Sequence, residues 1–170
     1  MKKVLIVVLV LAFHAGIAQR IAYVEIEKII NQMPEYTRAN EIIEAQTIQW
    51  ESEVESKFEA VENLYQEYVK NERMFSDDVK LQKQDEIREA EKLAKEFREQ
   101  KFGKQGELTK LTEQKIKPLQ DKIFKSAEKV ATENNYDYVF DKTPESNWIY
   151  VKPEHNITEK VIADIVTKPE

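Results

Sequence analysis

The residue types that carry most enzymatic chemistry are scarce in this sequence. None of its 170 residues is a cysteine, which excludes disulfides, thiolate metal sites and cysteine nucleophiles. A phosphate-binding loop needs clustered glycines so that the backbone can approach its ligand, and Gly16, Gly103 and Gly106 form no such cluster. Nucleotide-dependent chemistry is therefore not indicated.

The histidines and carboxylates also form no catalytic or metal-binding pattern. Nucleophilic catalysis needs a base beside a serine, and His14 lies in a segment that we expect to be removed, which leaves His155 alone. The acidic runs at 51–55 and 85–89 fall in helical registers that face water. We therefore predict no enzyme activity, no metal and no cofactor.

The first residues have the order of a secretory signal peptide. Lys2 and Lys3 precede an apolar run at 4–13, and small residues follow it as far as Ala18. We predict cleavage between Ala18 and Gln19, with an uncleaved anchor as the alternative. Loss of the two lysines takes the formal net charge from −6 to −8. The mature protein is thus expected to be exported and acidic.

The composition indicates long solvated helices. Charged residues make up 34% of the sequence, above the roughly 25% of ordinary globular domains. Nucleic-acid binding would need a basic stripe, which an acidic chain does not supply, so that class of partner is excluded.

A helical hairpin is predicted in the middle of the chain. Between 37 and 75 there is no glycine or proline, and apolar residues recur at the spacing of a coiled-coil seam, at Val54, Phe58, Val61, Tyr65 and Tyr68. Ser76, followed by two aspartates, is a good N-cap for a second helix, which places the turn near 74–76.

Three residues interrupt the second helix. Gly103 and Gly106 each cost about 1 kcal/mol against alanine, and Pro118 removes a hydrogen bond inside the helix. We expect the arm to flex at these positions. A local kink with no functional role is the alternative.

Charge favours antiparallel pairing of the two helices. Residues 35–75 carry a net charge of −6, whereas residues 76–118 carry +1. The second segment contains a basic tract, which we expect to pair with the acidic first helix. Contact with anionic lipid or acidic clients is the alternative for this tract, whose members are Lys80, Lys83, Arg88, Lys92, Lys95 and Arg98.

The chain ends should build a small sheet. Alternating apolar residues after Arg20 predict a short strand that runs into a helical turn. Near the other end, 136–141 and 147–151 are β-branched and aromatic and flank a turn sequence, which predicts a β-hairpin. Asn156 and Glu159 have the spacing of a capping box that begins a terminal helix.

The predicted arm has more large apolar residues than a two-helix seam needs. Such side chains adapt to many surfaces, so some of them could contact a ligand, with ordinary packing as the alternative. The candidates for client contact are Trp50, Met74, Phe75, Leu81, Leu93 and Phe102.

The sequence resembles the Skp/OmpH family of periplasmic chaperones. The resemblance is carried by IAYVEIEKIINQMPEY near the start and by KPLQDKI, NNYDYVFD and NITEKVI near the end. It implies a mainly α fold, in which a long antiparallel helical hairpin projects from a small β-sheet trimerisation body. Under this interpretation 1–18 is the signal peptide, 19–36 and 119–170 form the body, and 37–118 forms the arm.

The resemblance also implies a function. Family members are homotrimers whose arms enclose a cavity for unfolded outer-membrane proteins, and they need no ATP. We therefore expect a periplasmic holdase chaperone that prevents aggregation. The alternative is a structural coiled-coil spacer or adaptor of the envelope. The residues implied in the body and trimer interface are Ile21, Tyr23, Val24, Tyr138, Val139, Phe140, Ile149 and Tyr150.

The chain departs from its relatives mainly in charge. Glu25 and Asn156 each stand where relatives often have aspartate, and both changes are mild. The best-known relatives are basic, and their charge is thought to attract acidic clients and lipopolysaccharide, whereas this chain is acidic. No lipopolysaccharide site is transferred, and contact with lipopolysaccharide or a membrane surface stays open. We expect client capture to depend weakly on salt.

Overall fold

The computed structural model describes residues 19–167, which divide into two compact units. Residues 33–120 form the arm unit, and residues 19–32 and 121–167 form the body unit. Residues 1–18, with the predicted signal peptide and Ala18 of its cleavage site, lie outside the described residues. The predicted fold class, mainly helical with a helical hairpin and a small sheet, is confirmed.

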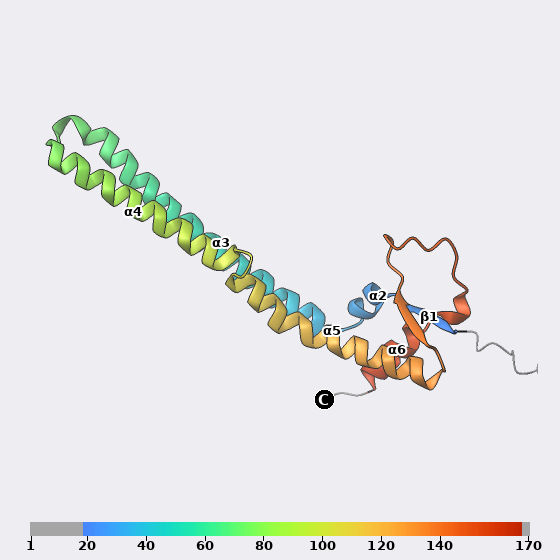
Figure 1. Cartoon of the computed structure of the whole chain (residues 1–170). Helices are drawn as coiled ribbons and strands as arrows, with labels where there is room; N and C mark the ends of the chain where they lie inside the picture. The colour runs from blue at the N-terminus through green and yellow to red at the C-terminus, as the bar shows by residue number, and fades with distance from the viewer. Residues whose placement is uncertain (1–18, 168–170) are drawn as a thin grey trace, which may run out of the picture. The chain divides into compact units, whose positions relative to one another are not determined.

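The arm unit contains two long helices that pack against each other (Figure 1). Helix α3 (Pro34–Asn71) begins with a proline in its first turn, and a short 3₁₀ turn (Glu72–Met74) ends it. Helix α4 (Asp77–Phe102) is capped as predicted, because the Ser76 hydroxyl accepts a hydrogen bond from the backbone N–H of Val79 at 3.4 Å. The reversal of the chain therefore lies between Asn71 and Asp77.

The seam of the hairpin differs from its predicted register at one position. Tyr65 is 49% exposed, and Leu64 is half-buried in its place. Both residues satisfy the three-and-four spacing between Val61 and Tyr68, so the pattern alone could not choose between them. Ala94 is buried on α4, where a small side chain allows close packing.

The second helix of the hairpin is interrupted at the two glycines but not at the proline. Helix α4 ends at Phe102, and helix α5 (Glu107–Glu133) begins after Gly106. Pro118 lies inside α5, which continues through it. The glycines therefore separate two helices, whereas the proline is accommodated within one.

The pKa of Lys83 on α4 is raised mainly by Glu86 on its own helix and further by Glu67 on α3, so the expected charge attraction between the two helices is present at longer range. At ion-pair distance, five basic residues of α4 find acids three or four positions away on their own helix, which requires no contact between helices. These pairs are Lys80–Asp77, Lys83–Glu86, Arg88–Asp85, Lys92–Glu89 and Lys95–Glu91.

Basic side chains of each helix also contact aromatic rings of the other helix. Lys57 of α3 lies 4.8 Å from the ring centroid of Phe97 on α4. In the opposite direction, Arg98 of α4 lies 5.8 Å from the ring of Phe58 on α3. Such contacts contribute about 0.5–1 kcal/mol at exposed sites, so they add specificity to an otherwise apolar seam.

The body unit is built around a two-stranded parallel sheet. Strand β1 (Ile21–Val24) pairs with β2 (Tyr138–Asp141) in the register Ile21 to Tyr138 and Val24 to Asp141. The predicted first strand and the helical turn after it, α2 (Ile26–Asn31), are confirmed. Unlike the predicted alternation, Ala22, Tyr23 and Val24 are all buried, because the body covers both faces of β1.

The predicted β-hairpin is wrong. Only its first half forms a strand, and 147–151 is irregular and largely exposed. Aromatic and β-branched residues favour a pleated, half-buried surface, and within one chain β2 pairs with β1 instead. A strand propensity without a neighbouring strand does not produce a strand.

The predicted terminal helix forms, with its cap shifted by one residue. Helix α6 (Thr158–Val166) has Ile157 as its N-cap, and the Asn156 side chain accepts a hydrogen bond from the backbone N–H of Thr158 at 2.9 Å. The backbone N–H of Ile157 is taken by the carbonyl of Tyr23 on β1. The sheet therefore fixes the chain just before the helix. Ile157, Val161, Ile162 and Ile165 are buried beside it.

Candidate functional site

Three of the six candidate client-contact residues are exposed on the arm unit. Met74 is 77% exposed at the turn, and Leu81 and Leu93 on α4 are 60% and 53% exposed. Further exposed apolar side chains are present on α3, at Ile42, Ile48, Tyr65 and Val69. The arm therefore presents dispersed apolar residues on a charged background.

The other three candidates pack inside the arm unit. The rings of Trp50 and Phe102 meet edge to face with centroids 6.5 Å apart. Phe75 is half-buried against Tyr68, whose centroid is 6.3 Å away. These three half-buried residues therefore make packing contacts within the arm.

The eight candidate residues of the body also include both buried and exposed side chains. Tyr23 and Val24 are buried, so they belong to the core of a single chain. Ile149 is fully exposed and Tyr150 is 75% exposed in the irregular segment after β2. Val139 is half-buried, and the remaining three are exposed at the sheet, namely Ile21, Tyr138 and Phe140.

Two apolar depressions accompany these exposed residues. One, of about 400 Å³, lies between β2 and the body segment of α5, where Ile123, Ala127 and Phe140 contribute to its lining. The other, of about 240 Å³, lies between β1 and the segment that carries Trp148 and Tyr150. Exposed apolar side chains beside open apolar depressions are typical of a surface that another polypeptide covers.

A polar network that the sequence did not predict joins the two ends of the body. Glu25 follows β1 directly, and its Oε1 accepts a hydrogen bond from Asn156 Nδ2 at 2.9 Å. Its other oxygen pairs with Lys28 Nζ at 2.8 Å, and its backbone N–H donates to the Thr158 hydroxyl. The Lys28 ammonium and the Asn156 amide hold the pKa of Glu25 below its ordinary value, although partial burial opposes them. The one feature of the sequence that could have indicated this network is the position of the Glu25 carboxylate directly after a predicted strand.

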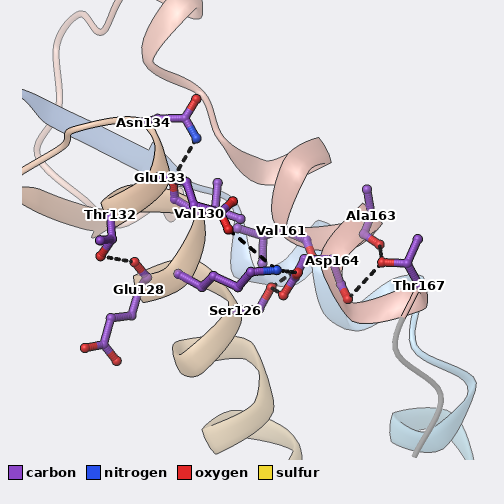
Figure 2. A network of polar contacts seen from close by, with 11 residues as sticks. Ser126, Glu128, Val130, Thr132, Glu133, Asn134, Val161, Ala163, Asp164 and Thr167 are labelled. Atoms are coloured by element: carbon purple, nitrogen blue, oxygen red, sulfur yellow. Dashed lines mark hydrogen bonds and ion pairs between the residues drawn. The ribbon is translucent and has the colours of Figure 1, made fainter.

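A second network fastens α6 to α5. The buried Ser126 hydroxyl donates to Asp164 Oδ2 at 2.9 Å and also lies 3.2 Å from the Val161 carbonyl. Figure 2 shows Ser126 and Asp164 pointing toward one another, and Lys129 forms an ion pair with the same carboxylate. The polar groups of Ser126 and Asp164 have hydrogen-bond or ion-pair partners within the body unit. Their role is therefore to position α6 against α5.

His155 lies beside Tyr136, and the centroids of the two rings are 6.0 Å apart. Within residues 19–167, no hydrogen bond joins the His155 ring to a serine or cysteine. In that part of the chain no group of three or more histidine, aspartate and glutamate side chains could hold a metal ion. None of the described helices has the length and apolarity needed to cross a membrane.

The fold and its apolar surfaces define a helical-hairpin protein with a small sheet, and the comparisons identify its family. The model of the OmpH-like outer membrane protein family matches residues 20–165. The chain therefore belongs to the OmpH-like family.

A solved structure shows the same fold. The chain is similar to an OmpH-like protein from Caulobacter crescentus, described as a candidate outer membrane chaperone. The two share 10% sequence identity, and the match has a TM-score of 0.68 and covers 91% of this chain and 88% of that chain. No curated protein matches the chain in sequence.

Proposed function

We propose that this protein is an exported, ATP-independent holdase chaperone of the periplasm. Membership of the OmpH-like family and the likeness to a protein described as an outer membrane chaperone support a chaperone role. The observation that carries the proposal is the set of exposed apolar residues on the arm unit, above all Met74, Leu81 and Leu93. Weak, dispersed apolar contacts suit the retention of an unfolded chain without a fixed register.

The proposed clients are unfolded outer-membrane proteins. Their strands expose apolar side chains during transit and aggregate unless they are covered. In the proposed mechanism the client lies in a cavity between the arms of several copies, where many weak contacts raise its effective concentration. Because each contact is weak, release needs no nucleotide. No enzymatic step, cofactor, nucleic acid or lipopolysaccharide site forms part of the proposal.

The proposed assembly is a homotrimer formed through the body unit. Ile149 and Tyr150 are exposed apolar residues on a segment with strand-like composition but no strand partner among residues 19–167. The edge of β2 and the depression of about 400 Å³ beside it offer a complementary surface. Covering these groups with another copy would remove apolar area from water. This supports assembly through the sheet, and the three-fold number comes from the family resemblance.

The proposed activity is tested by diluting a urea-unfolded outer-membrane barrel protein into buffer with and without the mature chain. Light scattering should remain low at near-stoichiometric amounts of chaperone. Multi-angle scattering of the chaperone alone should give the mass of three chains. Unchanged aggregation of the client would contradict the holdase proposal, whatever the mass.

The assembly surface is tested separately with Ile149→Asp. Burial of a carboxylate at an apolar contact is unfavourable, so this variant should shift the mass toward that of one chain while the helix content stays the same. Asn147→Asp, in the same segment and with the same change of charge, is the matched control and should retain the wild-type mass. An unchanged mass for Ile149→Asp would place the interface elsewhere.

A structural spacer or adaptor of the envelope is the second candidate. The packing of Trp50, Phe75 and Phe102 inside the arm favours it, because a spacer needs its apolar residues only in the seam. The exposure of Leu81 and Leu93 favours the holdase. If the protein does not suppress client aggregation in the scattering experiment, the spacer becomes the favoured function.

A further inference from the structure

The segment between α4 and α5 is a tightly built joint. The backbone N–H of Gly103 donates to the Glu99 carbonyl at 2.8 Å, and that of Gly106 donates to the Gly103 carbonyl at 2.8 Å. A Cβ atom at Gly106 would lie 2.8–2.9 Å from backbone atoms, and one at Gly103 would lie 2.4 Å from the Glu99 carbonyl oxygen. Side chains are therefore excluded at both positions, and the chain closes into a compact turn.

A carboxylate bridges this joint. Glu107 is the first residue of α5, and its Oε1 accepts a hydrogen bond from Gln100 Nε2 at 2.9 Å. Its Oε2 forms an ion pair with Lys101 Nζ at 2.5 Å. Both partners belong to the last turn of α4, so one side chain holds the two helix ends together. The hydrogen bond from Lys101 holds the pKa of Glu107 below its ordinary value.

The cation of this bridge is seated on aromatic rings. Lys101 Nζ lies 5.0 Å from the ring centroid of Trp50 on α3 and 5.2 Å from that of Phe97 on α4, and its side chain is only 13% exposed. Trp50 in turn contacts Phe102, the last residue of α4. The ion pair is thus anchored to the opposite helix of the hairpin and is partly shielded from solvent.

We propose that Lys101 and Glu107 form an electrostatic latch that holds the glycine joint of the arm closed. With the latch engaged, α4 and α5 are fixed to each other and to Trp50. When the ion pair is broken, the backbone hydrogen bonds of Gly103 and Gly106 open more often and the joint loosens. Salt, or a charged group that competes for Lys101, would release it. The latch is a property of the arm unit and does not rest on chaperone activity.

Amide hydrogen exchange at the joint tests the latch in the full mature chain, without a client. In Glu107→Gln, the amides of Gly103 and Gly106 should exchange roughly five- to tenfold faster than in the wild type. About 1 M NaCl should accelerate exchange in the wild type, after correction for the intrinsic rates of an unfolded peptide, but have little effect on Glu107→Gln. Glu113→Gln, which removes an exposed charge from the same helix, should match the wild type.

A second variant separates the latch from a simpler effect. Glu107 lies at the N-terminus of α5, where any negative charge stabilises the helix. Lys101→Met keeps the apolar stem on Trp50 but removes the cation, so the latch predicts the same loosening as Glu107→Gln and no further loosening in the double variant. Wild-type exchange in Lys101→Met would overturn the latch, as would wild-type exchange in Glu107→Gln.

Trp50 supplies an independent optical readout. Trp148→Phe removes the second tryptophan of the chain, so that Trp50 alone reports on the joint. In this background, Glu107→Gln should make Trp50 more accessible to acrylamide, and Glu113→Gln should not. Equal quenching in both variants, together with unchanged exchange, would reject the proposal independently of any result with clients.

Discussion

Asn156 donates a hydrogen bond from Nδ2 to Oε1 of Glu25 at 2.9 Å, across a separation of 131 residues in sequence. Asn156 also forms a parallel bridge with Tyr23, so it lies beside β1 on the side away from β2. The same asparagine accepts a hydrogen bond from the first residue of α6. This pair therefore connects the beginning of the body unit to its C-terminal helix.

The Glu25 contact predicts a pH dependence of folding stability. Because the pKa of Glu25 is lowered from its ordinary value of 4.5 in the folded state, its ionised form stabilises the fold at neutral pH. This contribution is lost as the pH falls below 4.5 and through the folded-state pKa. Glu25→Gln should therefore be less stable than the wild type at about pH 7, and the difference should shrink toward about pH 3.

Thermal unfolding followed by circular dichroism over this range measures the difference. Glu27→Gln is the matched control, because Glu27 is exposed on α2 and its removal changes the net charge equally. This control should follow the pH curve of the wild type. A difference between Glu25→Gln and wild type that does not vary with pH would contradict the predicted role of ionised Glu25.

The buried hydroxyl of Ser126 predicts a loss of stability in the body unit. Ser126→Ala removes the hydrogen bond to Asp164 and leaves that carboxylate with fewer partners, so unfolding in urea should cost about 1–2 kcal/mol less. Thr132→Ala on the same helix is the control, because its exposed hydroxyl bonds only to the Glu128 carbonyl one turn away. Equal midpoints for the two variants would show that the Ser126 contact contributes little.

Exposed and packed apolar residues of the arm should separate in their effects. Replacing Leu81 and Leu93 together by serine should weaken suppression of client aggregation several-fold with little change in unfolding temperature, because both side chains already face water. Trp50→Ala should instead lower the unfolding temperature, since it empties the contact with Phe102 and Lys101. Gln82→Ser, at an exposed polar position, should leave both quantities unchanged.

Client capture should depend weakly on salt. The sequence is acidic overall, and most basic residues of α4 are already paired with acids on the same helix. Apolar contact therefore supplies most of the expected affinity, and apolar contact is not screened by ions. The dissociation constant of a fluorescent client should change less than about threefold between low and physiological salt. A steep loss of affinity would show that electrostatic attraction dominates.

Local patterns in the sequence predicted those parts of the fold that local contacts decide. The seam spacing, the cap at Ser76 and the strand before α2 each depend on residues within a few positions of one another. The exact seam residue at 64 or 65 was not predictable, because both fit the same period. The charge pattern did not predict the close ion pairs, which form within α4 at lower entropic cost than pairs between helices.

The candidate residues could be identified from the sequence, but the sequence did not show which of them are packed and which are exposed. Hydrophobicity selected Trp50 and Leu81 equally, although one contacts Phe102 and the other faces water. Similarly, composition selected Tyr23 and Tyr150, of which only the first is buried. Burial depends on neighbours that are distant in sequence, so residue type alone could not supply this distinction.

The helical hairpin and the lack of the common catalytic residue patterns could be deduced from the sequence alone, because periodicity and residue types are local properties. Strand pairing, in contrast, depends on the folded arrangement of the whole body unit. Tyr138–Asp141 pairs in parallel with Ile21–Val24 rather than with the segment that follows it, because a strand forms where a partner backbone offers hydrogen bonds. The contacts of Glu25 with Asn156 and of Glu107 with Lys101 across a glycine turn depend on the folded structure too, since only folding brings these groups within hydrogen-bond distance.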